Sequence, residues 1–117
     1  MFEEEFLLPS TLGAMAKTFY VKTPKSLRQD DRYIKPGSKV TSIKVIAQGE
    51  KIIQRLVRTY PLPNGELTKA EDWYKVRGTA TITNGIEERT EEIHWYQCEN
   101  IGKVEYKLKR WGDDNFS

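Results

Sequence analysis

The sequence predicts an α+β fold in which N-terminal helices pack on one face of a three- to four-stranded antiparallel sheet, with a meander at residues 74–111. Residues 91–111 alternate apolar and polar side chains with a period of two, as half-buried strands do. Asn84-Gly85 is a strong hairpin signal, because both residues tolerate the positive φ of a tight turn. Apolar residues in 50–60 recur instead at the spacing of a helix.

The length and composition fit a single domain over residues 1–117, which would bury roughly two thirds of its unfolded surface. The 19 Lys and Arg against 17 Asp and Glu leave a net charge of +2, and no apolar run approaches the ~20 residues of a membrane helix. The amino terminus is acidic where a secretory signal would be basic, and the single cysteine, Cys98, suits a reducing compartment. We therefore expect a cytoplasmic protein that does not enter a membrane.

The first third of the chain has no single period. Residues 10–19 hint at one helix with Ser10 as its N-cap. Turn-forming residues follow, so residues 1–36 could form a loosely packed N-terminal arm. The β-branched run at 40–46 fits either a fourth strand or the lead into a helix.

The clearest helix is predicted over residues 50–60, ending before Pro61. Thr68 and Glu71 have the spacing of a capping box, which predicts a single helical turn before Trp73. Helices would thus cover the apolar face of the sheet.

Residues 74–82 alternate in the same way as the last two strands. A turn centred on Asn84-Gly85 would match aromatic, aliphatic, ionic and threonine partners across the hairpin. The pairs are then Tyr74 with Trp95, Val76 with Ile93, Arg77 with Glu92, Thr79 with Thr90 and Lys75 with His94. A second turn centred on Asn100-Ile101 pairs Ile93 with Leu108, Trp95 with Tyr106, His94 with Lys107 and Tyr96 with Glu105.

On this register the face away from the core carries a row of Lys75, His94 and Lys107. The residues that flank the row are Arg77, Glu92, Tyr96, Glu105 and Lys109. Lysines can hold a phosphodiester, and a histidine beside a carboxylate can transfer protons near pH 7. These residue types favour metal-free RNA cleavage, in which a base takes the ribose 2′ proton and an acid protonates the leaving 5′ oxygen.

With one histidine in the sequence, a mechanism that uses two is impossible. Glu105 or Glu92 could act as the base with His94 as the acid, or His94 could act alone with lysine and tyrosine assistance. Tyr96 could stack on a nucleobase. One His and one Cys do not make a zinc site of the usual composition, and no P-loop or dinucleotide fingerprint occurs, so we expect no metal and no cofactor.

A solvated surface would account for the same pattern. Any half-buried antiparallel sheet shows alternating Lys, Glu, Thr and Tyr on its outer side, and a lone histidine is more often incidental than catalytic. The three tryptophans fit core packing better than base stacking. Cys98 has no second histidine or aspartate to make it a nucleophile. The glutamates within 87–92 fit a solvated hairpin tip better than a Mg²⁺ site.

Three segments resemble the closing part of the carboxy-terminal toxin domains of bacterial polymorphic toxins. They are residues 72–78 (DWYKVRG), 92–96 (EIHWY) and 101–111 (IGKVEYKLKRW). The resemblance extends more loosely to Gly37-Ser38-Lys39 and to the helix around Arg55, and so covers about two thirds of the chain. In layout the chain is similar to the barnase/EndoU/colicin/RelE-like ribonucleases, which place helices before an antiparallel sheet and cut RNA without a metal. The resemblance implies that the site residues are His94, Lys107 and Lys109, followed by Arg110 and Lys103.

The leading hypothesis is therefore a small metal-independent ribonuclease of toxin type that cuts tRNA or mRNA, with a cognate immunity or antitoxin protein as a further partner. The predicted catalytic residues are His94, Glu105, Lys107 and Lys109. The predicted nucleic-acid-binding residues are Lys75, Arg77, Tyr96, Lys103 and Arg110. The alternative is a non-catalytic nucleic-acid-binding module, or a protein-interaction module of immunity or accessory type, on the same fold. The pattern indicates no oligomeric state.

Overall fold

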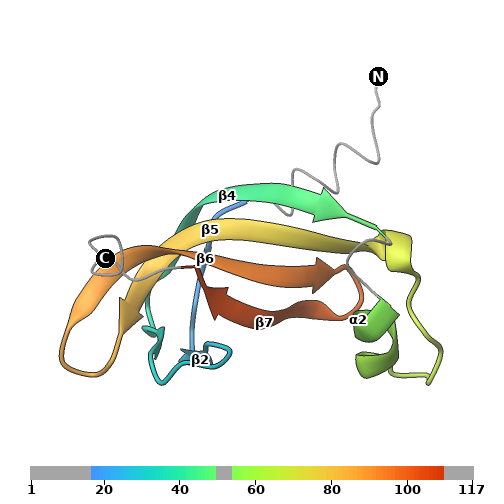
Figure 1. Cartoon of the computed structure of the whole chain (residues 1–117), viewed down its shortest axis with the longest axis horizontal. Coiled ribbons are helices and arrows are strands. Elements are labelled where there is room, and N and C mark those ends of the chain that lie inside the picture. The colour runs from blue at the N-terminus through green and yellow to red at the C-terminus, as the bar shows by residue number, and fades with distance from the viewer. Residues whose placement is uncertain (1–16, 50–53, 110–117) are drawn as a thin grey trace.

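The computed structural model describes residues 17–49 and 54–109, which form a sheet with little helix (Figure 1). The strands are β1 (Phe19–Tyr20), β2 (Lys25–Ser26), β3 (Tyr33–Ile34), β4 (Lys39–Gln48), β5 (Trp73–Thr83), β6 (Glu88–Cys98) and β7 (Gly102–Leu108). The helical elements are α2 (Gln54–Thr59) and the 3-10 turn η2 (Ala70–Asp72). No helix among the described residues is long and apolar enough to cross a membrane.

All seven strands belong to one antiparallel sheet, built around the long β5–β6 hairpin. β4 pairs with most of the free edge of β5, β3 pairs with the rest of it, and β7 lies beside β6. The sheet curls, so that the loop after β2 reaches the far edge: the Arg28 N–H donates to the Tyr106 carbonyl at 2.8 Å. This contact joins two ends of the sheet that are remote in sequence.

The predicted α+β class, with N-terminal helices on a three- to four-stranded sheet, is wrong. Residues 17–48 form β1 to β4, and the apolar face of the meander is covered by the curl of the sheet itself. Strands of two residues are too short to show a period, and Gln29, Gly37 and Ser42 each take a positive φ that interrupts the extended chain. Because these short strands show no detectable period, the prediction assigned their residues to a helix or to loops.

Two apolar clusters lie on opposite faces of the sheet. The inner face, within the curl, carries the larger one, whose members include Val21, Leu27, Ile34, Val40, Val76, Ile82, Ile93 and Trp95. The outer face carries the second, in which Leu56 of α2 packs with Trp73 and Cys98. Because side chains alternate along a strand, the residues between the inner-face positions of β5 and β6 point to the outer face. α2 covers only one end of that face (Figure 1).

Gly78 allows the inner cluster to close. A Cβ at this position would lie 3.1 Å from the Trp95 ring, 3.1 Å from Val40 and 3.2 Å from the Thr41 carbonyl. Such contacts are tighter than normal van der Waals packing, so a larger side chain would displace the Trp95 ring. Trp95 also contacts Phe19 edge-on, with ring centroids 5.8 Å apart.

The β5–β6 register differs by two residues from the predicted one. The loop has four residues, 84–87, so Val76 faces Trp95 and Arg77 faces His94, whereas the prediction paired them with Ile93 and Glu92. The Asn84 side-chain oxygen accepts the N–H groups of residues 86 and 87 at 2.9 and 2.8 Å, which favours this longer loop over a two-residue turn. A shift of two leaves every side chain on its predicted face.

The β6–β7 register is confirmed for Ile93 with Leu108 and His94 with Lys107. Beyond them a β-bulge at Glu105, whose φ is +58°, makes Tyr96 face Val104, so the predicted pair of Tyr96 with Glu105 is wrong. The bulge also places Val104 in the outer cluster and Tyr106 in the inner one.

The predicted helices are observed only in part. Of the helix at 10–19, residues 10–16 lie outside the described residues, and Phe19 begins β1. The helix at 50–60 is observed as α2, with 50–53 outside the described residues. The run at 40–46 is a strand, and a helical turn does precede Trp73, although Thr68 does not cap it. The Thr68 hydroxyl instead accepts the Trp73 indole N–H at 2.8 Å.

Candidate functional site

A row of basic side chains crosses four strands of the outer face. Lys44 of β4 faces Arg77 of β5, Arg77 faces His94 of β6, and His94 faces Lys107 of β7. Direct cross-strand partners lie on the same face of a sheet with Cβ atoms about 5 Å apart. The register therefore brings three cations and the histidine into one line.

This row differs in two members from the predicted one. Arg77 takes the place predicted for Lys75, because the longer β5–β6 loop shifts the pairing by two residues. Lys75 instead faces Tyr96, two residue pairs closer to the α2 end of the hairpin. Lys44 was not predicted, because the β-branched run at 40–46 was left open between a strand and a helix and was given no register against β5.

His94 is held by its neighbour on the same strand. Its Nε2 lies 2.8 Å from a carboxylate oxygen of Glu92, and the side chain is 13% exposed. The other oxygen of Glu92 lies 3.9 Å from an Arg77 guanidinium nitrogen. Because an ionised carboxylate only accepts hydrogen bonds, Nε2 of a neutral His94 carries the ring proton in this pair. Nδ1 is then the ring nitrogen that can take up a second proton.

A small hollow of about 100 Å³ lies beside the row, and six of the nine predicted site residues line it. These six are Lys75, His94, Tyr96, Glu105, Lys107 and Lys109. Trp95 and Arg28, which was not predicted, complete the lining. Arg28 comes from the β2–β3 loop, and only the closure of the sheet brings it to β7. Four cations thus surround the histidine in a concave part of the outer face.

Glu105 lines the hollow but its carboxylate is fully engaged. One oxygen accepts from Arg55 at 2.7 Å and Arg28 at 3.3 Å, and the other accepts from Arg55 and the Tyr60 hydroxyl, both at 2.9 Å. The Arg55 hydrogen bonds are the main cause that lowers the pKa of Glu105, against the opposing effect of burial. An ionised carboxylate offers about four acceptor positions, and here all are taken. This geometry favours Glu92 over Glu105 as the carboxylate that works with His94.

The other predicted residues lie in different places. Lys103 is not in the hollow: its ammonium lies 4.2 Å from the Phe19 ring centroid, and desolvation lowers its pKa. Tyr96 lines the hollow and also packs against the outer cluster. Arg77 stands in the row next to the hollow. Arg110 lies outside the described residues.

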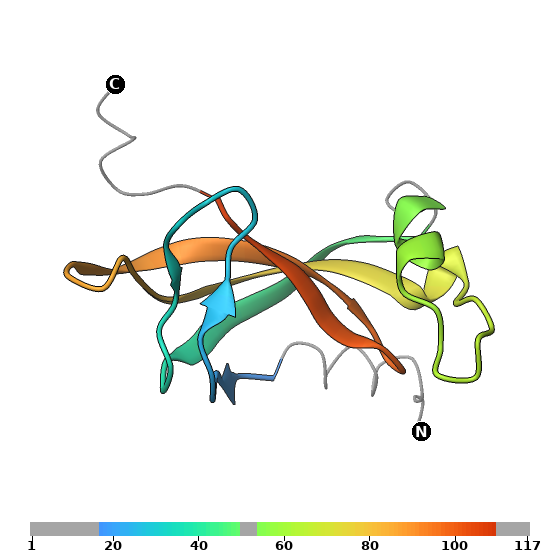
Figure 2. The ribbon, with the colours of Figure 1, turned by 90° about the horizontal axis from the view of Figure 1, so that it is seen from below.

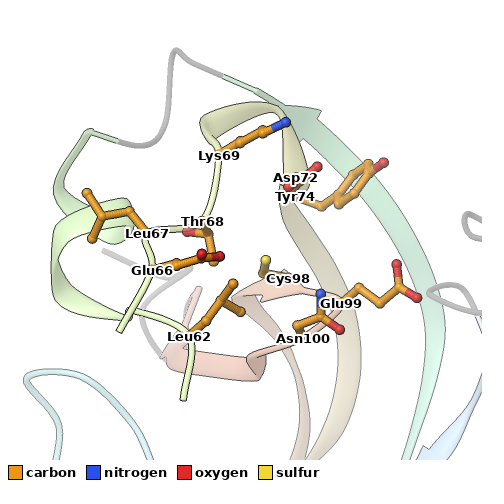
Figure 3. A pocket seen from close by; sticks show the side chains of 10 residues that line it. All are labelled: Leu62, Glu66, Leu67, Thr68, Lys69, Asp72, Tyr74, Cys98, Glu99 and Asn100. Atoms are coloured by element: carbon orange, nitrogen blue, oxygen red, sulfur yellow. The ribbon is translucent and has the colours of Figure 1, made fainter. Parts of the chain in front are cut away.

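A second hollow, of about 380 Å³, lies at the α2 end, away from the basic row (Figure 3). The 62–69 loop and the β6–β7 turn form its walls, with three carboxylates, from Glu66, Asp72 and Glu99, against one lysine, Lys69. Burial raises the pKa of the Cys98 thiol at its base. Within residues 17–49 and 54–109, no three His, Cys, Asp or Glu side chains are grouped so that they could hold a metal ion.

No family model, curated protein or solved structure matches this chain. The resemblance to toxin domains therefore stays a prediction.

Proposed function

We propose that the protein binds RNA on the outer face of its sheet and cleaves it without a metal ion. The observation that carries the proposal is the row of Lys44, Arg77, His94 and Lys107, with the His94–Glu92 pair at the edge of a cationic hollow. The net charge of +2 would be weak support for a polyanion partner, but cations gathered on one face support it more strongly.

The row suits a strand of nucleic acid. Four strands span three inter-strand distances of about 4.8 Å, or roughly 14 Å, which is the rise of about four stacked nucleotides. Lysine and arginine side chains at that spacing would neutralise successive phosphates and release their counterions. Tyr96, at the side of the hollow, would stack on an unpaired base.

Cleavage would follow from the way Glu92 orients His94. The free Nδ1 of His94 takes the proton of the ribose 2′ hydroxyl, and Glu92 stabilises the imidazolium that forms. The 2′ oxygen attacks phosphorus and the bond to the 5′ oxygen breaks, leaving a 2′,3′-cyclic phosphate. Lys107, opposite His94, gives a proton to the leaving oxygen, while Lys75 and Lys109 stabilise the charge on phosphate.

The test is to incubate the purified protein with total bacterial RNA and defined tRNAs in EDTA. We expect discrete fragments with cyclic phosphate ends, and a loss of about 100-fold or more in rate for His94→Ala, as for removal of a general base. Lys107→Ala should also lose activity, whereas Arg58→Ala, an exposed cation of α2, should not. Intact RNA at high protein excess, or equal cleavage by a folded His94→Ala variant, would overturn the catalytic proposal.

The second candidate is a non-catalytic nucleic-acid-binding module on the same face. It is favoured by the small exposed fraction of the His94 side chain, 13%, and by its engagement with Glu92, which would suit a structural histidine. Such a module would bind RNA with an affinity that falls steeply with salt and would leave the RNA intact. Binding that His94→Ala does not change, with no turnover, would select this alternative.

A further inference from the structure

Two segments that are far apart in the sequence meet on the carboxylate of Glu105 in β7. Arg28 comes from the loop between β2 and β3, and Arg55 and Tyr60 come from α2 and the residue that follows it. Figure 2 shows this loop and α2 on the same side of the sheet, at opposite ends, with β7 between them. Glu105 therefore ties both flanks of the outer face to β7.

The backbone of Glu105 is adapted to this position. Its φ of +58° lies in the left-handed region, which costs a residue with a side chain about 1 kcal/mol. The bulge that this conformation makes turns the side chain towards Arg55, and four hydrogen bonds offset the strain. Strain held by so many contacts is often found at functional sites.

Both arginines have N–H groups that Glu105 does not use. A guanidinium carries five N–H groups, of which Glu105 takes one from Arg28 and two from Arg55. Their side chains are 46% and 53% exposed. Two arginines and one glutamate leave a net charge of +1, and Arg28 lines the same hollow as His94 and Lys107. The remaining N–H groups are thus available to an anion that lies beside the hollow.

We infer that Arg28 and Arg55 form a second phosphate subsite, fixed by Glu105 as a positioning residue, which makes the substrate of this face a polynucleotide and not a mononucleotide. The inference rests on the proposed RNA-binding function. One phosphate lies in the hollow beside His94, and a neighbouring phosphate of the same chain binds the planar forks of the two arginines. Their fixed orientation lowers the entropy lost on binding.

The test measures binding separately from cleavage. A fluorescent 2′-O-methyl RNA oligonucleotide of about twelve residues cannot be cut by 2′ attack, and its affinity is measured over a range of KCl concentrations. Arg28→Gln and Arg55→Gln should each weaken binding about 5-fold and lower the salt slope by about 0.7, the value for one phosphate of a single strand. Arg58→Gln removes the same charge from the same helix and should leave the slope unchanged. Competition by a mononucleotide should change less than about 2-fold in each variant.

Variants that keep the charge separate a subsite from a merely structural contact. Arg28→Lys and Arg55→Lys should restore the salt slope, with part of the affinity lost because lysine has no fork. If wild type binds the oligonucleotide and both glutamine variants show the same salt slope as wild type, the subsite is overturned while the proposed function stands. If wild type binds no oligonucleotide, the proposed function is overturned and the subsite with it.

Discussion

At Glu105, the backbone conformation of one residue determines which partners its side chain contacts. Strict alternation predicts that Glu105 faces Tyr96 and stands free to act as a base. The left-handed φ of this residue inserts a bulge instead, and the carboxylate meets Arg28, Arg55 and Tyr60. No pattern in the local sequence marks the bulge, because glutamate seldom adopts a positive φ.

The ion pairs of Glu105 predict a pH dependence of stability. Hydrogen bonds from Arg55 first, and then from Tyr60, lower its pKa below the ordinary value of 4.5. A lowered pKa in the folded state stabilises the protein fully above about pH 4.5, and this stabilisation is lost as the pH falls through the folded value. Glu105→Gln should therefore reduce the free energy of unfolding by about 1–2 kcal/mol at pH 6, and by much less at pH 3.

Urea unfolding at the two pH values measures this difference. Asp30, whose pKa Arg32 also lowers, is present in both proteins and cancels from the comparison. Glu66→Gln, which changes an exposed carboxylate of the 62–69 loop, serves as the control and should have little effect at either pH. An equal loss for Glu105→Gln at pH 6 and pH 3 would show that its charge does not stabilise the fold.

The composition of the outer face could be predicted, but the order of its residues could not. His94, Lys107 and Lys75 were placed correctly on one face, because any error of two residues in register preserves the face. The neighbours across the strands depend on loop length, which decided that Arg77 and not Lys75 faces His94. Arg28 could not be placed at all from its local sequence.

At the scale of elements, the β5–β6 loop determines the register of the longest hairpin. Its four residues are held by the Asn84 side chain, which accepts two backbone N–H groups, and by the Thr83 hydroxyl, which donates to the Glu87 carbonyl at 2.8 Å. Gly85 takes the positive φ of +97° that the loop needs. The sequence Asn-Gly is typical of turns of several lengths, so it marks a hairpin better than it marks a register.

Asn84→Ala should lower the free energy of unfolding by about 1–2 kcal/mol, because both N–H groups lose their partner. The matched control is Ile86→Ala in the same loop, whose side chain is 94% exposed and should matter by less than about 0.5 kcal/mol. Urea unfolding of the two variants beside wild type makes the measurement. If both variants lose the same amount, the side-chain oxygen of Asn84 does not hold the loop.

α2 is the element that depends most on its surroundings. The six described residues of α2 are far fewer than the ~12–15 residues that an isolated helix needs in water. Leu56, which is fully buried against Trp73 and Cys98, and the Arg55–Glu105 ion pair hold it on the sheet. Its apolar spacing made it predictable, whereas β1, β2 and β3 have two residues each and no period to detect.

In the molecule as a whole, one sheet separates two clusters of very different size. The buried residues of the inner cluster range from Val21 to Tyr106, and the contact of Arg28 with Tyr106 that closes it joins positions 78 residues apart in sequence. Among the residues that the structure describes, the outer cluster has three buried members, and α2 and the segment that follows it cover this cluster. Contacts of such long range cannot be seen in a local pattern, which is why the curl of the sheet was not predicted.

The unequal clusters predict that the α2 end opens before the rest of the molecule unfolds. Cys98 is the only cysteine of the chain, is 3% exposed, and has a pKa raised by burial, so a thiol reagent should react with it slowly in the native protein. Leu56→Ala removes the anchor of α2 and should speed this reaction by about 10-fold or more, since local opening exposes the thiol. Ile34→Val weakens the inner cluster by about 1 kcal/mol and should leave the rate without denaturant unchanged, because the inner cluster stays closed during local opening. If both variants speed the reaction in proportion to their loss of global stability, the two clusters unfold as one cooperative unit and α2 does not open alone.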